Sequence, residues 1–310
     1  MKNNRYKTVG EVADLWKEDK RPYVKRSSFS VYVMTVENHI LPVFGGRRRI
    51  EEAEIQAFAL RKMQEGMSRK SVRDILTILK MIQKFGAKKG WLPYPDWNVR
   101  FPAEQKSCEV QVLSVSHQRR IMRHVIDNFT FRNLGIYLCL ATGMRIGEVC
   151  ALKWGDIGPA GDMVSVRRTI GRIYVLEEGR RHTELVIGPP KTRHSVRDIP
   201  VDRELAKLIR PLKKVMNDDF FVLTNDSVPI EPRTYRCYYK KLLRRLGVPD
   251  LKFHGLRHSF ATRCIESRCD YKTVSVLLGH SDISTTLNLY VHPNLEQKKK
   301  CIDRMFRTLK

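Results

Sequence analysis

Apolar residues recur every three to four positions along the first third of the chain, a spacing that places side chains on one face of an α-helix. Val9, Val12 and Trp16 follow it first. The segments 29–44, 51–63 and 72–85 repeat it, with Gly45-Gly46 closing the second helix. We therefore expect a four-helix unit of about 90 residues, a size at which a domain can fold alone.

The helical spacing is lost after this unit. Three prolines fall between residues 93 and 112, which indicates a linker. Helices are predicted again over 116–127 and 131–142, and Thr142-Gly143-Met144 then interrupts the pattern and places Arg145 in the first turn of a new helix. The predicted organisation is a helical domain over 1–92, a linker over 93–112 and a second domain over 113–310.

The period of the pattern shortens to two from about residue 162, which predicts short strands over 163–166, 172–176, 184–187 and 197–201. The turn 188–195 joins the last two strands, so we expect Lys191 on or beside a hairpin tip. Helices resume over 202–215 and 231–246. The fold class predicted is mostly α with a small antiparallel β-sheet.

The last segment, 294–310, places four apolar residues on one helical stripe. Such a terminal helix can pack on its own domain or on a neighbouring subunit, and the pattern leaves both open.

The balance of charged residues indicates what kind of partner the protein binds. The chain has 58 Lys and Arg against 33 Asp and Glu, a net charge of +25 that is spread along its length. This favours a polyanionic partner such as DNA or RNA, although a basic ribosome-associated protein would share the balance. The fourth predicted helix is the most basic, and we expect its cations to contact a DNA backbone: Arg69, Lys70, Arg73, Lys80 and Lys84.

The start of the chain is polar, and no run of about 18 apolar residues occurs, so neither a signal peptide nor a membrane span is expected. Seven cysteines without a regular pattern fit reduced thiols. We expect a cytoplasmic protein associated with the nucleoid.

The candidate chemistry lies near the C-terminus. Arg257 stands in an apolar run with no carboxylate three or four residues away, and burying an unpaired charge costs several kcal/mol, so an external anion is the simplest partner. His254 shares its helical face and can help to hold a phosphate. His280 precedes Ser281-Asp282, which opens a short helix that ends at Tyr290.

These residues, with two from earlier in the chain, resemble the active site of the tyrosine recombinases, also called the phage integrase family. The matching words are Ala141-Thr142-Gly143-Met144-Arg145, His254-x-x-Arg257-His258 and Leu278-Gly279-His280, with a tyrosine ten residues on. The resemblance covers essentially the whole chain, since the N-terminal helices look like the family's core-binding domain. The ordered set is Arg145, Lys191, His254, Arg257, His280 and Tyr290.

The resemblance implies that Tyr290 attacks a DNA phosphodiester and forms a 3′-phosphotyrosyl bond. A free phenol has a pKa of about 10, so it needs a proton acceptor, a role that His254 fits. The resemblance also implies that Lys191 protonates the departing 5′-oxygen, although Arg193 and His194 share the same turn.

The remaining residues of the set would stabilise charge. Arg145 and Arg257 would hold the non-bridging oxygens, and His280 would add a hydrogen bond. Glu148 would either orient Arg145 or form a plain helical ion pair with it. The sequence has no carboxylate cluster of metal-ligand spacing and no phosphate-binding loop ending in Lys-Ser/Thr, and the phosphotyrosyl link stores the bond energy, so no cofactor is expected.

The implied function is site-specific recombination or integration of DNA for a phage or mobile element. The implied assembly is a homotetramer on two double-stranded sites, linked through 294–310, with accessory DNA-bending proteins as optional partners. Because about seven residues precede the first predicted helix, we expect the short form of the family, without an arm-binding domain.

Three alternatives stay open. His254, His258, Cys264 and Cys269 lie close enough in sequence for a zinc site. A type IB topoisomerase would use the same residue types without site choice, and a non-catalytic DNA-binding regulator would share the charge. Tyr290 also lies on an apolar stripe with Ile283 and Leu287, as a packed core tyrosine would.

Overall fold

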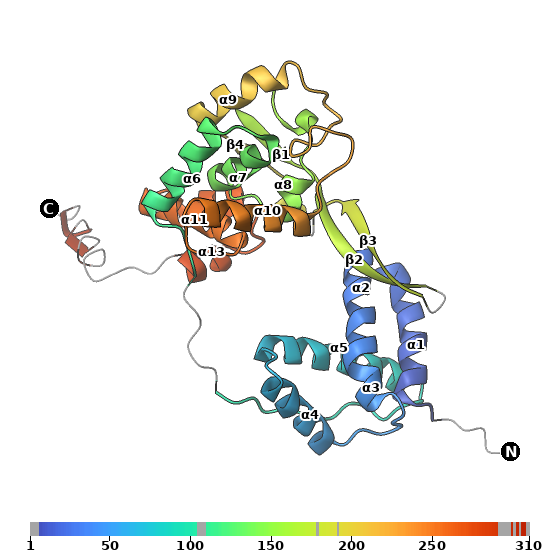
Figure 1. Ribbon diagram of the computed structural model, residues 1–310. Coiled ribbons are helices and arrows are strands. Elements are labelled where there is room, and N and C mark those ends of the chain that lie inside the picture. The colour runs from blue at the N-terminus through green and yellow to red at the C-terminus, as the bar shows by residue number, and fades with distance from the viewer. Residues whose placement is uncertain are drawn as a thin grey trace. The chain divides into compact units, whose positions relative to one another are not determined.

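The computed structural model describes residues 6–103, 110–177, 180–190, 192–290, 299, 302, 303 and 305–307. The chain divides into two compact units (Figure 1). The first contains Met1–Ser107 and Arg172–Glu184, and the second contains Cys108–Gly171 and Leu185–Lys310. The residues 172–184, which the sequence pattern assigned to the second domain, thus cluster with the first unit. The predicted fold class, mostly α with a few antiparallel strands, is confirmed.

The first unit contains the four predicted helical segments. Its second segment is continuous but includes a π-helical turn at Val36–Ile40 before Pro42. Because proline has no amide hydrogen and its ring crowds the preceding turn, a wider turn relieves the clash. The helices are α1 (Val9–Lys20), α2 (Arg26–Thr35), α3 (Leu41–Phe44), α4 (Glu52–Gln64) and α5 (Arg69–Lys88).

Local sequence fixes the helix starts in this unit. The Thr8 hydroxyl accepts from the Glu11 amide while the Glu11 carboxylate accepts from the Thr8 amide, a reciprocal cap at α1. The Ser68 hydroxyl caps α5 by accepting from the Ser71 amide. The apolar faces then meet in a core that contains Trp16 and Phe58, both at most 1% exposed.

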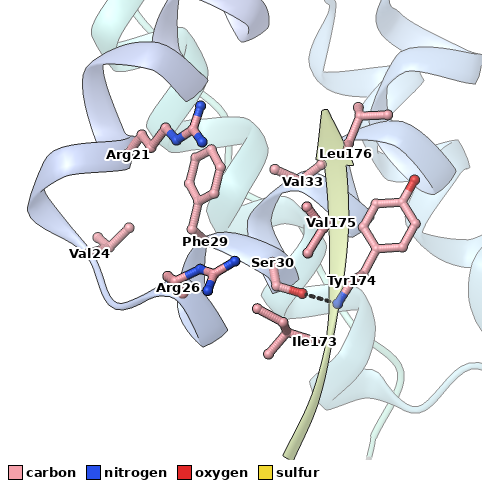
Figure 2. Close-up of a pocket in the computed structure, with 10 residues that line it drawn as sticks. All are labelled: Arg21, Val24, Arg26, Phe29, Ser30, Val33, Ile173, Tyr174, Val175 and Leu176. Atoms are coloured by element: carbon pink, nitrogen blue, oxygen red, sulfur yellow. Dashed lines mark hydrogen bonds between the residues drawn. The ribbon is translucent and has the colours of Figure 1, made fainter. Parts of the chain in front are cut away.

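A β-hairpin supplies residues 172–184 to the first unit. It consists of β2 (Thr169–Glu177) and β3 (Arg180–Gly188). Figure 2 shows how β2 lies along α2, with the Tyr174 amide donating to the Ser30 hydroxyl at 2.7 Å beside a small pocket of about 70 Å³. Arg26 adds an ion pair with Glu184 at 2.8 Å. Residues 172–184 are therefore part of the packing of this unit.

The second unit surrounds α7, which is apolar on all sides and buried. Helix α11 packs against α7 and also contacts α12 and α13, which places the C-terminal helices over the centre of the unit. Its helices are α6 (Val115–Asp127), α7 (Phe131–Thr142), α8 (Ile146–Cys150), α9 (Arg203–Lys213), α10 (Pro232–Arg245), α11 (His254–Glu266), α12 (Tyr271–Leu278) and α13 (Ile283–Tyr290).

The sheet of the second unit corrects one expectation. Strand β1 (Met163–Val166) pairs antiparallel with β4 (Arg197–Pro200), and β3 pairs with β2. The expected hairpin between the third and fourth strands is therefore wrong. Pro189-Pro190 has no amide hydrogens for a ladder, and the short helical turn Arg193–Ser195 then redirects the chain toward β1. Lys191 itself lies outside the described residues.

Two further sequence predictions concern the whole chain. Within the described residues, no helix is long and apolar enough to cross a membrane. Of the predicted helix 294–310, residues 299, 302, 303 and 305–307 are helical, and the others lie outside the described residues.

Candidate active site

Five of the six candidate catalytic residues come together in the second unit. Arg145 precedes α8, and His254 and Arg257 occupy the start of α11. His280 follows α12, and Tyr290 is the last residue of α13. The sixth, Lys191, lies outside the described residues, so its position stays a prediction.

Arg257 is the most buried charge of the site, at 1% exposure. Its guanidinium donates to the carbonyls of Gly143 at 2.9 Å and Leu278 at 2.7 Å, so it joins the ends of α7 and α12. Burial and repulsion from Arg145 and Arg197 lower the pKa of Arg257 to about 9. The group remains a cation at neutral pH, and within the described residues no carboxylate forms an ion pair with it.

Glu148 holds Arg145 through two hydrogen bonds at the start of α8, and Arg145 donates both. The Glu148 carboxylate accepts from the Arg145 amide at 2.9 Å and from its guanidinium at 2.7 Å. The same guanidinium donates to the carbonyl of Gly279 at 3.3 Å. The Arg145 side chain is 35% exposed, so it is fixed on one side and open on the other.

Glu148 holds a second arginine, which was not among the residues predicted from the sequence. Arg197, at the start of β4, is buried and donates to Glu148 at 3.0 Å and to the Leu277 carbonyl at 2.6 Å. Burial alone would raise the pKa of Glu148, but Arg197 and Arg145 hold it below its usual range. The sequence did contain a sign that Arg197 is buried: Arg197 and Ile199 are two residues apart, so they share the inward face of a strand.

His280 follows a glycine that the geometry requires. Gly279 has φ +64°, and a Cβ there would lie 2.9 Å from the carbonyl oxygen of His194. The Nδ1 atom of His280 lies 2.8 Å from the buried hydroxyl of Thr286. Burial and the charges of Arg257 and Arg145 lower the pKa of His280 to about 4, so the ring is neutral at neutral pH.

The hydroxyl of Tyr290 lies 2.6 Å from Nδ1 of His258. Tyr290 is 9% exposed. Burial raises the pKa of the phenol, while Arg257 and Arg145 act in the opposite direction, which places both arginines within electrostatic reach of the oxygen. From the sequence we expect His254 as the proton acceptor, but the hydrogen bond to Tyr290 is made by His258, one helical turn further on.

His254 packs against His258. Its ring lies edge to face against the ring of His258, with centroids 4.6 Å apart. Partial desolvation, His258 and Arg257 lower the pKa of His254 to about 4, although the residue is exposed. The sequence could have indicated that His258 belongs to the site, because it follows His254 by four residues and so lies on the same helical face.

The zinc alternative finds no support in this geometry. Across the part of the chain that the structure describes, no group of three or more His, Cys, Asp or Glu residues could hold a metal ion. His258, one of the four residues considered for zinc, directs Nδ1 toward Tyr290.

The candidate DNA-binding cations lie on α5 in the first unit. Four of them stack on aromatic rings of the segment that follows α5: Arg69 and Arg73 on Phe101, Lys80 on Trp97 and Lys84 on Tyr94. Arg69, Arg73 and Lys80 also line a groove of about 480 Å³ between α5 and residues 97–101. Lys70 is exposed. The extended linker residues thus belong to the same surface as the cations.

Comparison with known proteins extends these observations over the whole chain. Residues 111–297 match the phage integrase family, and residues 8–63 match the N-terminal SAM-like domain of phage integrases. A tyrosine recombinase XerC-like protein of Caldanaerobacter subterraneus is 27% identical over 96% of this chain and 82% of its own length.

Solved structures share the fold. The Tn1549 transposon integrase in complex with transposon right end DNA superposes with a TM-score of 0.77 at 18% identity, covering 96% of this chain and 99% of the other. A lambda integrase tetramer bound to a Holliday junction gives 0.62 at 16% identity, covering 92% and 78%. The family match spans more than half of the sequence and every candidate catalytic residue. The chain therefore belongs to the phage integrase family, and it is a tyrosine site-specific recombinase.

Proposed function

We propose that this recombinase cuts and rejoins one DNA strand at a time through a covalent link between the phosphate and Tyr290. The observation that carries the proposal is a convergence of contacts: Arg145 and Arg257 donate to the carbonyls of the adjacent residues Gly279 and Leu278, and the Tyr290 hydroxyl lies 2.6 Å from His258, the residue after Arg257. Arg257 is buried, and its described hydrogen bonds go only to carbonyls, so a phosphodiester would supply the missing negative charge.

The two arginines would bind the non-bridging oxygens as charge builds on phosphorus. Both are fixed before substrate arrives, Arg145 by Glu148 and Arg257 by two carbonyls. Preorganised donors of this kind contribute about 10²- to 10³-fold each to such reactions. His280 would add a neutral donor, because a Thr286 hydroxyl that donates to Nδ1 leaves the proton on Nε2.

Lys191 is proposed to give a proton to the departing 5′-oxygen, by resemblance to the family. The exchange conserves bond energy, since one phosphodiester is replaced by a phosphotyrosyl ester and later restored. The freed hydroxyl, or that of another strand, then attacks the phosphotyrosyl bond and releases Tyr290.

The basic face of α5 is proposed to hold the DNA duplex. Cations attract the backbone without reading sequence, and the aromatic rings beneath Arg69, Arg73 and Lys80 keep those cations extended along the groove. Two fold relatives, a transposon integrase and a lambda integrase, are bound to DNA in their solved structures. We propose a mobile-element role for this chain.

The test is covalent trapping. A nicked duplex that carries the protein's selected binding site should form a protein–DNA adduct with the wild type and none with Tyr290→Phe. DNA binding by the variant should be unchanged, which separates chemistry from binding. An adduct retained by Tyr290→Phe would remove Tyr290 as the nucleophile. Relaxation of plasmid without a site would instead indicate a topoisomerase.

A homotetramer joined through residues 294–310 is proposed for strand exchange, in line with the lambda integrase tetramer on a Holliday junction. Removing residues 294–310 should abolish pairing of two DNA sites while single-site binding remains. Unchanged pairing in a two-site bridging assay would exclude this helix as the connector.

A further inference from the structure

The nucleophile's hydroxyl is bound by a histidine that the family resemblance did not assign. Nδ1 of His258 lies 2.6 Å from the Tyr290 oxygen and joins α11 to α13. From this contact we infer that His258 takes the proton from Tyr290 as the phenol attacks phosphorus. The inference rests on the proposed function, because it assigns a role within that reaction.

The direction of the hydrogen bond follows from the two groups. A phenol whose pKa is raised by burial stays protonated at neutral pH, so its O–H donates. Nδ1 of His258 must then be the acceptor, and the ring proton lies on Nε2. Burial and Arg257 lower the pKa of His258, which keeps the ring neutral and able to accept.

Substrate controls when the proton moves. Transfer creates an imidazolium one residue from the cation Arg257, which opposes it while the site is empty. A phosphodiester bound to Arg257 and Arg145 cancels part of that positive charge, which makes His258 more basic. The nucleophile is therefore activated by the DNA that it will cut, and the empty enzyme keeps its phenol protonated.

The atoms balance along this path. The proton of the Tyr290 hydroxyl passes to Nδ1 of His258, and the phenol oxygen forms the new bond to phosphorus. The bond from phosphorus to the 5′-oxygen breaks, and that oxygen takes a proton from the acid proposed above. On rejoining, the 5′-hydroxyl returns its proton to the conjugate base of that acid, and Tyr290 recovers its own from His258.

The surroundings of His258 hold the ring in place. Its titratable and charged neighbours in the described residues are His254 and Arg257 on its own helix and Tyr290 on α13. The His254 ring packs against it edge to face, so His254 is a positioning residue in this scheme.

A two-by-two comparison tests the inference. The wild-type chain and the His258→Ala variant are each prepared with tyrosine or with a more acidic fluorinated tyrosine at position 290, and single-turnover cleavage of the nicked duplex is measured. With ordinary tyrosine, His258→Ala should slow cleavage by about 10²-fold or more. With the acidic phenol the loss should shrink to less than about tenfold, because little help is then needed to remove the proton.

Equal losses with both phenols would overturn the inference and leave His258 a structural residue. His258→Gln keeps an acceptor but no base, so it should be as slow as His258→Ala; full activity would also refute the proposal. Glu266→Gln, at the exposed end of α11, is the matched control and should keep the wild-type rate.

The pH profile gives a second readout. Burial and Arg257 lower the pKa of His258, so the wild-type cleavage rate should fall only when acid protonates a ring that titrates below the ordinary histidine range, and His258→Ala should lose this dependence. An adduct retained by Tyr290→Phe would defeat the proposed function itself, so its failure is distinguishable from failure of the role given to His258.

Discussion

Arg197 and Arg257 are both buried arginines, but they have different partners, and we expect different roles for them as a result. Arg197 is paired with Glu148, while the described hydrogen bonds of Arg257 go to carbonyls. The first charge is neutralised inside the protein. The second is left for the substrate, as the absence of a nearby carboxylate in the sequence already predicted. The neutralised arginine holds Glu148 and the Leu277 carbonyl, and the other one is proposed to bind phosphate.

Glu148→Gln should destabilise the protein strongly. Glu148 is 2% exposed and is the carboxylate partner of Arg145 and Arg197, so the change leaves a buried arginine without its counter-charge. Breaking such a pair from one side costs about 3–5 kcal/mol. Urea unfolding at pH 7 measures the effect. Glu204→Gln removes an exposed carboxylate partner, that of Lys207, and should cost less than about 1 kcal/mol. Equal losses would show that the Glu148 network adds nothing beyond a surface pair.

Spacing could identify some residues of the site and not others. His254, Arg257 and Tyr290 stand in short motifs with apolar neighbours, so the sequence could nominate them as candidates. His258 and Arg197 act through contacts between distant segments, such as the 49-residue separation of Arg197 from Glu148. Such contacts follow from tertiary packing, which no local pattern contains.

Helix ends build the site at the level of elements. Helix α7 ends at Gly143 and α12 at Gly279, both in the left-handed conformation. Their carbonyls accept from Arg257 and Arg145 respectively. The C-terminal end of a helix carries partial negative charge, so both ends favour the cations that they hold. The two glycines therefore position the arginines as well as end the helices.

Gly279→Ala should disrupt this arrangement more than Gly247→Ala does. Both glycines have positive φ, but a Cβ at Gly279 would lie 2.9 Å from the His194 carbonyl, whereas at Gly247 the nearest atom is 3.8 Å away. The left-handed conformation alone costs about 1–2 kcal/mol. Gly279→Ala should exceed that cost in urea unfolding and also weaken trapping on the nicked duplex. Equal stability losses and normal trapping would contradict the role given to Gly279.

Elements that are fixed by residues close in sequence could be predicted, whereas those that depend on distant residues could not. Helices with capping residues and a clear apolar stripe, such as α1 and α5, begin and end close to the expected positions. Strand pairing was not predictable, because β4 could pair with β3 or β1 on the same alternation, and Pro189-Pro190 together with tertiary packing decided it. The π-helical turn before Pro42 likewise depends on a steric detail that periodicity does not contain.

The whole molecule combines a charge of +25 with a groove in which cations rest on aromatic rings. The net charge pointed to a nucleic acid from the sequence alone. The groove could not be predicted, because it needs the linker residues 97–101 to fold back along α5.

Arg69→Ala and Arg73→Ala should each weaken DNA binding uniformly across sequences. Each lost phosphate contact reduces the slope of the logarithm of affinity against the logarithm of salt concentration by about one. Fluorescence anisotropy with random duplex DNA over a salt series measures the slope. Arg61→Ala, an exposed arginine of α4, is the control and should leave it unchanged. A slope that falls equally in all three variants would argue against a specific role for the groove.

The composition of the first unit from two stretches of chain has a consequence for biosynthesis. Residues 172–184 leave the ribosome well after residue 107, because part of the second unit is translated in between. Until then the α2 surface that receives Tyr174 is uncovered, with Ser30 still lacking its hairpin partner. The N-terminal helices can form early, but this face is sealed only when translation has passed into the later half of the message.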